Sequence, residues 1–419
     1  MTAVPRAWTQ DLAPNRNIAV FHLLTIVMSC VFISGNWIFY WTRFMTYGQL
    51  GVVDASAFAF GLLMEVPTGA IADMIGKKRT MLAAMLCQAA GILLMASTEG
   101  PTQLVAGFLL MQTGWAFYSG ATEALAYDSL RERGQEGSFE RILALNHRLS
   151  IITIVISTLL GGLLYNVHYR LPHYAWGLAF VAGFAVALLL REARVEHESS
   201  ASFPVIQEKQ PGWREYLSAY GQQLGAGFRQ LMQPALRPYV PLIFGVLGVY
   251  FLYSFGLISP AMATGFGFMA DGQAVVFALL GTVAALAVGF LPALRRRFSD
   301  RSGLALLGLL LALGFVGGAL PLGVWGFGAL LCIRLAGALA NPWISVVVNQ
   351  QIPSRYRATT LSTIALLVKI PYVASAVIAG AMVEAGTFWL FNLLVAAGTL
   401  LLVGASLLAF RARPMSPSS

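Results

Sequence analysis

Five ionisable side chains lie inside long apolar stretches of the chain, where charged residues are rare. They are Glu65, Glu123, Arg148, Arg334 and Lys369. If these stretches cross a lipid bilayer, each charge costs at least about 2.5–3.5 kcal/mol, so each needs a partner or a water-filled cavity. Carboxylates in such places can bind and release protons, and cations can hold anionic groups. These five residues are therefore the first candidates for a site within a membrane.

The two cations in the second half of the chain are expected at membrane mid-depth. Lys369 follows Ala358 by 11 residues and Arg334 follows Gly323 by 11, so each lies roughly 16 Å along its stretch. Solute-binding sites of membrane proteins lie at this depth, so both cations could hold an anionic or polar substrate group. Further candidates for lining the same cavity are Asn341, Arg148 and Trp115, although packing between helices is the alternative for Trp115.

The two glutamates suggest a different chemistry. Glu65 precedes Asp73 by eight residues, roughly 12 Å along one helix face, with Gly69 between them. Glu123 lies roughly 7 Å before Asp128, in the same half of the membrane. Either glutamate could carry a coupling proton, because a carboxylate in a medium of low dielectric is readily neutralised. The alternative is that the five charges pair with one another across the cavity and keep the two halves of the protein aligned.

A short polar turn, residues 69–79 with the sequence GAIADMIGKKR, separates two apolar stretches. Gly69 allows two helices to approach closely, and Gly76 supplies a backbone freedom that other residues lack. Asp73 is placed where a carboxylate can bind helix N–H groups or the basic side chains of Lys77 and Lys78. The turn is therefore a candidate for electrostatic contacts at the membrane edge.

This turn resembles the signature loop between spans 2 and 3 of the major facilitator superfamily (MFS), Gly-x-x-x-Asp-Arg/Lys-x-Gly-Arg/Lys-Arg/Lys. Met74 replaces the basic residue after the aspartate. The resemblance implies that Asp73 meets the start of span 11 in the outward-facing state and that Asp128 lies beside the basic residues. These contacts would form a breakable latch, although capping of the loop alone is the alternative. The expected latch residues are Gly69, Asp73, Gly76, Lys77, Lys78, Asp128 and Arg357.

The elements that must position these residues are membrane-spanning helices. Of the 419 residues, 58% are hydrophobic and only 11% charged, against about 25% charged in soluble domains. Each span needs roughly 20 apolar residues. We expect an all-α membrane protein with twelve spans, near 18–41, 52–72, 80–98, 102–127, 142–167, 172–190, 238–262, 271–293, 303–321, 323–348, 358–382 and 386–410.

The spans divide into two pseudo-symmetric six-helix halves. We expect an N-terminal bundle over 1–190, a cytoplasmic linker over 191–237 and a C-terminal bundle over 238–419. From Trp213 onward, apolar residues of the linker recur at helical spacing, which predicts an amphipathic helix on the membrane surface. Most of the 27 Lys and Arg residues fall in the termini and in loops of one side, which places both termini in the cytoplasm.

Other segments extend the resemblance over essentially the whole chain. Residues 352–359, 65–69 and 123–128 look like parts of MFS exporters of the drug-efflux type. Two departures weaken the parallel. Leu110 stands where many proton-coupled members carry an arginine, and residues 157–162 lack the Gly-Pro of drug antiporters. Within the chain, the second half weakly repeats the first, and its turn at 294–297 is basic like the turn at 69–79 but lacks the aspartate.

The resulting prediction is a secondary active transporter of the cytoplasmic membrane, not an enzyme. No phosphate-binding loop and no His/Cys cluster at metal spacing is present, so we expect no cofactor and no metal. Proton-coupled antiport that exports a drug-like compound or metabolite is the first interpretation. Uptake or exchange of an anionic metabolite, and a lipid-handling or sensor protein on the same fold, are the alternatives. The expected partners are a small-molecule substrate, protons and membrane lipid, without nucleic acid, and the expected state is a monomer.

Overall fold

The computed structural model describes residues 15–192 and 213–411, and these residues form helices and connecting turns without a strand. Side chains are not described for a few residues inside helices, among them Glu65, Gly69 and Asp73. Within the described ranges, nine helices are long and apolar enough to cross a membrane, and a bent pair makes ten. The all-α membrane prediction is therefore confirmed, and the twelve-span count remains a prediction consistent with the helices.

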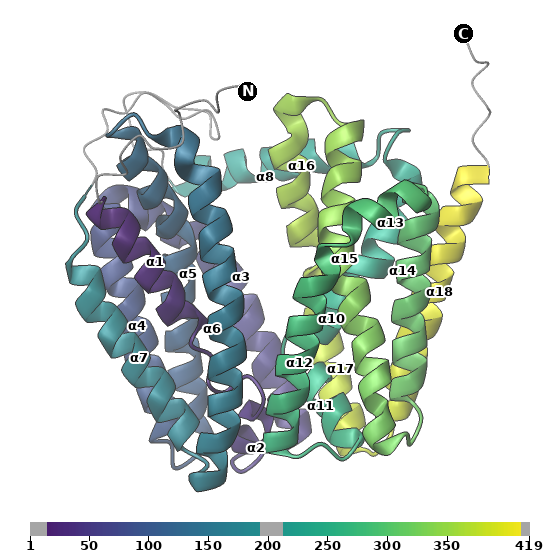
Figure 1. Cartoon of the computed structure of the whole chain (residues 1–419), viewed down its shortest axis with the longest axis horizontal. Coiled ribbons are helices and arrows are strands. Elements are labelled where there is room, and N and C mark those ends of the chain that lie inside the picture. The colour runs from purple at the N-terminus through teal and green to yellow at the C-terminus, as the bar shows by residue number, and fades with distance from the viewer. Residues whose placement is uncertain (1–14, 193–212, 412–419) are drawn as a thin grey trace, which may run out of the picture. The chain divides into compact units, whose positions relative to one another are not determined.

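The helix order follows the predicted spans (Figure 1). The first group comprises α1 (Arg16–Ser29), α2 (Trp37–Trp41), α3 (Tyr47–Ile75), α4 (Lys77–Ala96), α5 (Pro101–Arg131), α6 (Phe139–Val167) and α7 (Leu171–Leu188). The second group comprises α8 (Trp213–Leu231), α9 (Val240–Ile243), α10 (Val249–Ser254), α11 (Ile258–Gly265), α12 (Ala270–Val288), α13 (Leu291–Arg297), α14 (Asp300–Gly318), α15 (Gly326–Gln351), α16 (Ser354–Leu367), α17 (Ile370–Glu384) and α18 (Phe388–Arg411).

Two predicted spans are broken, and a third contains an irregular turn. The span at 18–41 stops at Ser29 and resumes as α2. The span at 238–262 contains a π-helical turn (Phe244–Gly248) and then bends by 71° between α10 and α11. The span at 358–382 is interrupted before α17, where Pro371 lacks the N–H that a continuous helix would use. Hydropathy alone could not locate these breaks, because the apolar runs continue through them.

The chain divides into two compact units that do not coincide with its two sequence halves. Unit 1 consists of Met1–Ile33, Ala59–Leu160 and Val167–Glu198. Unit 2 consists of Ser34–Phe58, Gly161–Asn166 and Ser199–Ser419. The division cuts through α3 and near the end of α6, so the first three turns of α3 pack with the second half of the chain.

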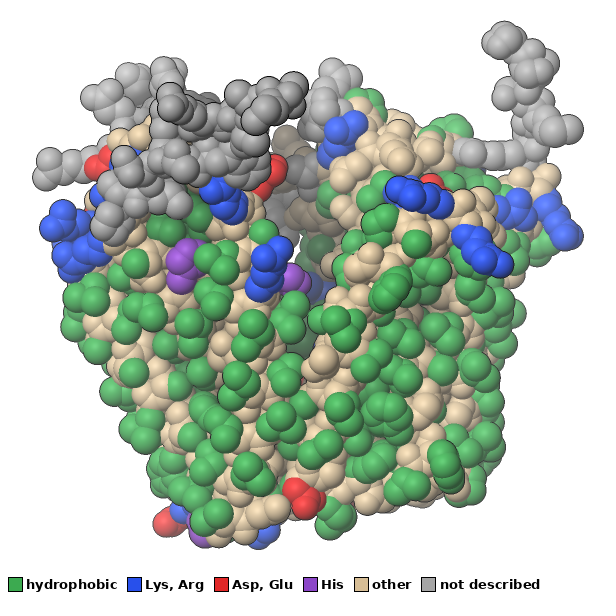
Figure 2. All heavy atoms as spheres, in the orientation of Figure 1, with side chains coloured by type: hydrophobic (Ala, Val, Ile, Leu, Met, Phe, Trp, Pro, Cys, Tyr) green, Lys and Arg blue, Asp and Glu red, His purple; other side chains and the backbone are tan. Residues whose placement is uncertain are grey.

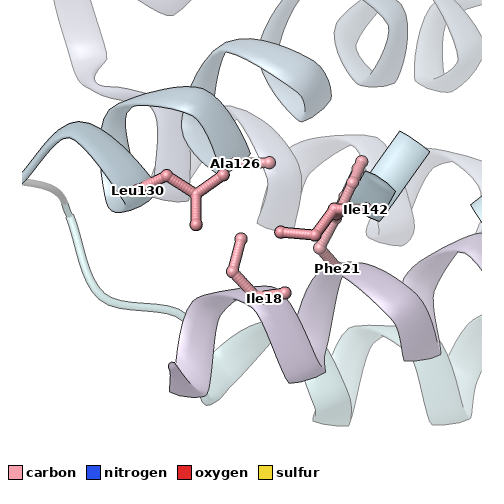
Figure 3. Packing of buried hydrophobic residues seen from close by; sticks show 5 residues of the cluster. All are labelled: Ile18, Phe21, Ala126, Leu130 and Ile142. Carbon is pink, nitrogen blue, oxygen red and sulfur yellow. The ribbon is translucent and has the colours of Figure 1, made fainter. Parts of the chain in front are cut away.

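Unit 1 is built around α4, which packs against α5 and α7. A side chain at Gly91 or Gly107 would collide with the backbone of the facing helix, so these glycines allow α4 and α5 to approach closely. An apolar cluster then joins α1, α5 and α6 (Figure 3). Its buried members are Ile18, Phe21, Ala126, Leu130 and Ile142.

Unit 2 is built around α14 and α15, with α18 on the other side of α14 (Figure 1). A side chain at Gly303 would overlap the ring of Trp343, so the indole fits against α14 only because that position is glycine. The predicted amphipathic helix is present as α8 and packs on α16. Figure 2 shows that apolar side chains cover the visible flank of each unit, with Lys and Arg gathered at the helix ends. This distribution fits helices whose flanks face lipid.

Candidate functional site

Two of the predicted latch residues meet at the end of unit 1 where α4 begins and α5 ends. The Lys77 ammonium group forms an ion pair with the Asp128 carboxylate. About a quarter of each side chain remains exposed (26% and 25%), so water partly screens the pair. The pair joins the start of α4 to the last turn of α5, although the two residues are 51 positions apart in the chain. Because the pair is partly screened, it can form and separate at a modest cost in free energy.

The start of α4 is also capped from a distant segment. Both oxygens of Glu192 accept hydrogen bonds, one from the backbone N–H of Lys77 at 2.7 Å and one from that of Lys78 at 2.9 Å. Gly76 precedes the helix with a φ of 91°, which is the backbone freedom expected of it. A carboxylate at a helix N-terminus interacts favourably with the helix dipole. Glu192 was not predicted, because its distance of 115 residues along the chain hides the contact.

The same end of unit 1 contains a polar junction centred on Asn17. Its side-chain amide donates to the Ser129 hydroxyl and to the Arg191 carbonyl oxygen, both at 2.8 Å, and its oxygen accepts from the Arg191 N–H at 2.9 Å. The junction thus ties the first turn of α1 to α5 and to the segment after α7. Together with Glu192, it fixes the geometry around the Lys77–Asp128 pair.

The exposed face of α5 combines a carboxylate with aromatic rings. Trp115, Ser119, Glu123 and Tyr127 follow one another at four-residue spacing, and all four are exposed. Trp115 is 53% exposed, so it does not serve mainly to pack against other helices. The Glu123 side chain is likewise exposed and is not enclosed by other protein atoms. A charged residue on an apolar helix is tolerated where the face lines water, so this stripe suits the wall of an aqueous path.

In unit 2, Arg334 of α15 is half-buried and donates a hydrogen bond to the Tyr250 hydroxyl of α10 at 2.8 Å. The Tyr250 ring lies against Gly337, where any side chain would overlap it. Asn341 lies seven residues after Arg334, on the same helix face, and is exposed. The face therefore offers a guanidinium oriented by a phenol and an amide roughly 10 Å further along the helix.

Lys369 lies at the interruption between α16 and α17, where it is the N-cap residue of α17 and half-buried. Arg148 of α6 is exposed and has no hydrogen bond or ion pair with another described residue. Arg357 of α16 donates to the carbonyl oxygen of Ile352 at 3.1 Å, so its head group closes the turn that precedes its own helix. The side chains of Glu65 and Asp73 lie outside the described residues, although both positions are helical in α3.

The basic residues in the last turn of α13 do have an acidic partner. Asp300, in the first turn of α14, accepts hydrogen bonds from the Arg295 side chain at 3.1 Å and from the Trp343 indole at 2.7 Å. The carboxylate follows the basic residues instead of preceding them, so a search for the order seen at 69–79 misses it. The contact links α13, α14 and α15.

A buried carboxylate of α3 was also missed. Asp54 is only 5% exposed and accepts hydrogen bonds from the Tyr372 hydroxyl of α17 and the backbone N–H of Leu257. The predicted span at 52–72 contains this residue near its start. The available signal was a lone acid in the run from Leu50 to Met64, which is otherwise free of charge.

Comparison with known proteins identifies the fold. The family model described as Major Facilitator Superfamily matches residues 17–375. A comparison of the sequence with curated proteins found no match. Among solved structures, the nucleoside transporter NupG superposes with a TM-score of 0.71 at 14% identity, covering 95% of this chain and 99% of that chain.

Two further structures agree. A bacterial homologue of the human lysosomal transporter Spinster has a TM-score of 0.66 at 16% identity, covering 97% of this chain and 100% of that chain. The D-xylose–proton symporter has a TM-score of 0.66 at 12% identity, covering 95% and 97%. At such identities the likeness concerns the fold alone. Because the family model spans most of the chain, the protein belongs to the major facilitator superfamily and is a multi-pass membrane transporter.

Proposed function

We propose that the protein exports a small organic molecule from the cytoplasm in exchange for protons, by alternating access of its two six-helix halves. The stripe on α5 carries this proposal: a carboxylate, Glu123, lies between aromatic side chains on an exposed face of an apolar helix. A carboxylate on such a face suits a path that contains water, and the flanking rings suit the apolar body of a drug-like compound. Proton exchange at the carboxylate then supplies the coupling.

Glu65 is the second proposed coupling residue. It lies in α3, two helical turns before Asp73, so it belongs to the same membrane half as the turn at 69–79. The Lys77–Asp128 pair and Asp73 are proposed as the latch that opens and closes the cytoplasmic end. In this proposal the protein is a monomer of the cytoplasmic membrane with both termini in the cytoplasm.

The test uses inside-out vesicles that contain a pH-sensitive dye and are screened with candidate compounds. We expect compounds that are substrates to release protons from the vesicle lumen, and we expect the Glu65→Gln/Glu123→Gln double variant to lose this release while still folding. Glu99→Gln is the matched control, because Glu99 is exposed in the turn between α4 and α5, away from the α5 stripe and the turn at 69–79. Normal proton-driven transport in each single glutamine variant would contradict the assignment.

A second candidate function is the uptake or exchange of an anionic metabolite. The observation in its favour is Arg334, whose guanidinium is oriented by the Tyr250 hydroxyl and shares a helix face with Asn341. An oriented guanidinium binds carboxylate or phosphate in a defined geometry. Transport of a compound without proton movement, in both the unmodified protein and the glutamine variant, would favour this function over proton antiport.

A further inference from the structure

The buried carboxylate of Asp54 joins three predicted spans within unit 2. Its Oδ2 atom accepts a hydrogen bond from the Tyr372 hydroxyl of α17 and one from the Leu257 N–H, at 3.2 Å, at the start of α11. Among the residues that the structure describes, no cationic side chain forms an ion pair with it. The charge is therefore balanced by hydrogen-bond donors alone.

The break in the predicted seventh span provides one of these donors. The chain bends by 71° between α10 and α11, and Gly256 at the bend has a φ of 63°. The break leaves the first N–H groups of α11 without helical acceptors, and the positive end of the helix dipole attracts a carboxylate. The Asp54 carboxylate lies at the N-terminus of α11 although it belongs to a different span. It therefore caps α11, a role that is usually taken by a residue next to the helix in the chain.

Aromatic rings enclose the carboxylate and its partners. Phe58 of α3 lies 4.8 Å from Phe255 and 5.1 Å from Tyr372, measured between ring centroids. Phe251 stacks on Phe255 at 5.3 Å. These rings come from α3, α10, the bend and α17, so they keep water away from the hydrogen bonds and make those bonds stronger.

The start of α3 contacts α17 at a second point further along. The Glu384 carboxylate, at the end of α17, accepts hydrogen bonds from the Thr46 hydroxyl at 2.8 Å and the Gly48 N–H at 2.7 Å. Between the two carboxylates, Gly51 and Gly380 bring the helix backbones into contact. The Glu384 contact is exposed, whereas the Asp54 contact is buried, so Asp54 contributes more to holding the helices together.

We propose that Asp54 is a gating residue, whose carboxylate holds α3 against α11 and α17 and must leave Tyr372 and Leu257 each time this end of the transporter opens. This proposal rests on alternating access, because α3 belongs to the first six predicted spans and α11 and α17 belong to the last six. Alternating access separates those spans at one end of the membrane in each cycle. Loss of the carboxylate or of the phenol then shifts the equilibrium toward the open state.

The test measures how readily a buried cysteine reacts with a membrane-impermeant maleimide added to the side that α17 faces at Glu384. The reporter is Ala376→Cys, because Ala376 is fully buried on α17 and its carbonyl faces Gly51 of α3. It is introduced into a protein whose cysteines (Cys30, Cys87 and Cys332) are replaced by serine. Ala340→Cys in α15 is the second reporter, since Ala340 is equally buried in a helix that makes none of the hydrogen bonds to Asp54.

Asp54→Asn and Tyr372→Phe are each expected to increase the labelling rate at position 376 about tenfold, because charge-assisted hydrogen bonds that hold the closed state are lost. Labelling at position 340 should stay low in both variants. Glu99→Gln is the control for replacing a carboxylate by an amide and should change neither rate.

Unchanged labelling at position 376 in both Asp54→Asn and Tyr372→Phe would overturn the proposal. Labelling at position 340 in the Asp54→Asn protein would show that this variant is unfolded. The result for Tyr372→Phe, which removes only a hydroxyl, then supports or overturns the proposal. A separate result distinguishes failure of this inference from failure of the proposed function. Substrate that alters labelling at position 376 in the Asp54-containing protein would establish movement at this end, whatever the Asp54 variants do.

Discussion

At the scale of single residues, opposite charges join the ends of helices, both across a long stretch of sequence and between neighbouring helices. Lys77 meets Asp128 across α4 and α5, and Arg295 meets Asp300 beside Trp343. The first pair is one-quarter exposed, so its contribution to stability is small, on the order of 0.2–1 kcal/mol. An ion pair of this strength can separate and form again during a transport cycle.

Exchange of the two charges tests the Lys77–Asp128 pair. We expect Lys77→Ala and Asp128→Ala each to lower the transport rate, with at most a small fall in the melting temperature. The Lys77→Asp/Asp128→Lys exchange should recover part of the transport rate, because the attraction is restored. Glu99→Gln is the control, since Glu99 is exposed in the turn between α4 and α5 and is not one of the predicted latch residues. An exchange variant no better than either single variant would show that the pair itself is unimportant.

At the scale of elements, glycines set the distances between helices and the positions of breaks. Gly256 allows the left-handed bend between α10 and α11, and its missing side chain leaves room for Asp54 and Tyr372. Gly267, in the turn after α11, has a φ of 85° but no atom near the place of a side chain. Both glycines therefore need a positive φ, but only Gly256 has side chains packed where its own side chain would be.

This difference yields a prediction about the break. Gly256→Ala and Gly267→Ala should each lose about 1–2 kcal/mol of stability from the left-handed backbone. Only Gly256→Ala should also displace the carboxylate and the phenol, and so increase labelling of Ala376→Cys while both polar groups remain present. Labelling is measured with the impermeant maleimide described above. Equal labelling of the two alanine variants would show that the space at Gly256 does not matter for closure.

At the scale of the whole molecule, the charge distribution predicts its orientation in the membrane. Arg296 lies in the basic last turn of α13, and Val324 lies in the short segment before α15, where it is 69% exposed. Basic loops are retained in the cytoplasm. In a protein otherwise lacking cysteine, Val324→Cys should react with an impermeant maleimide in intact cells, and Arg296→Cys only after the membrane is permeabilised. The reverse pattern would place both termini outside the cytoplasm.

The sequence by itself determined the all-α membrane class, the superfamily and the approximate position of the helices. A helix satisfies its own backbone hydrogen bonds, so a long apolar run is enough to predict a span. The run cannot show where a span breaks, because breaks depend on the φ of one glycine or on a contact with another helix. Spans 1, 7 and 11 were therefore predicted as continuous.

Only the tertiary structure decided which polar residues meet. Asp54 reaches Tyr372 across 318 residues, and Glu192 reaches the start of α4 across 115. A buried polar group needs a partner, but its chemistry does not say which segment supplies that partner. The packing of small residues between helices decides this, because it sets which faces come within hydrogen-bond distance.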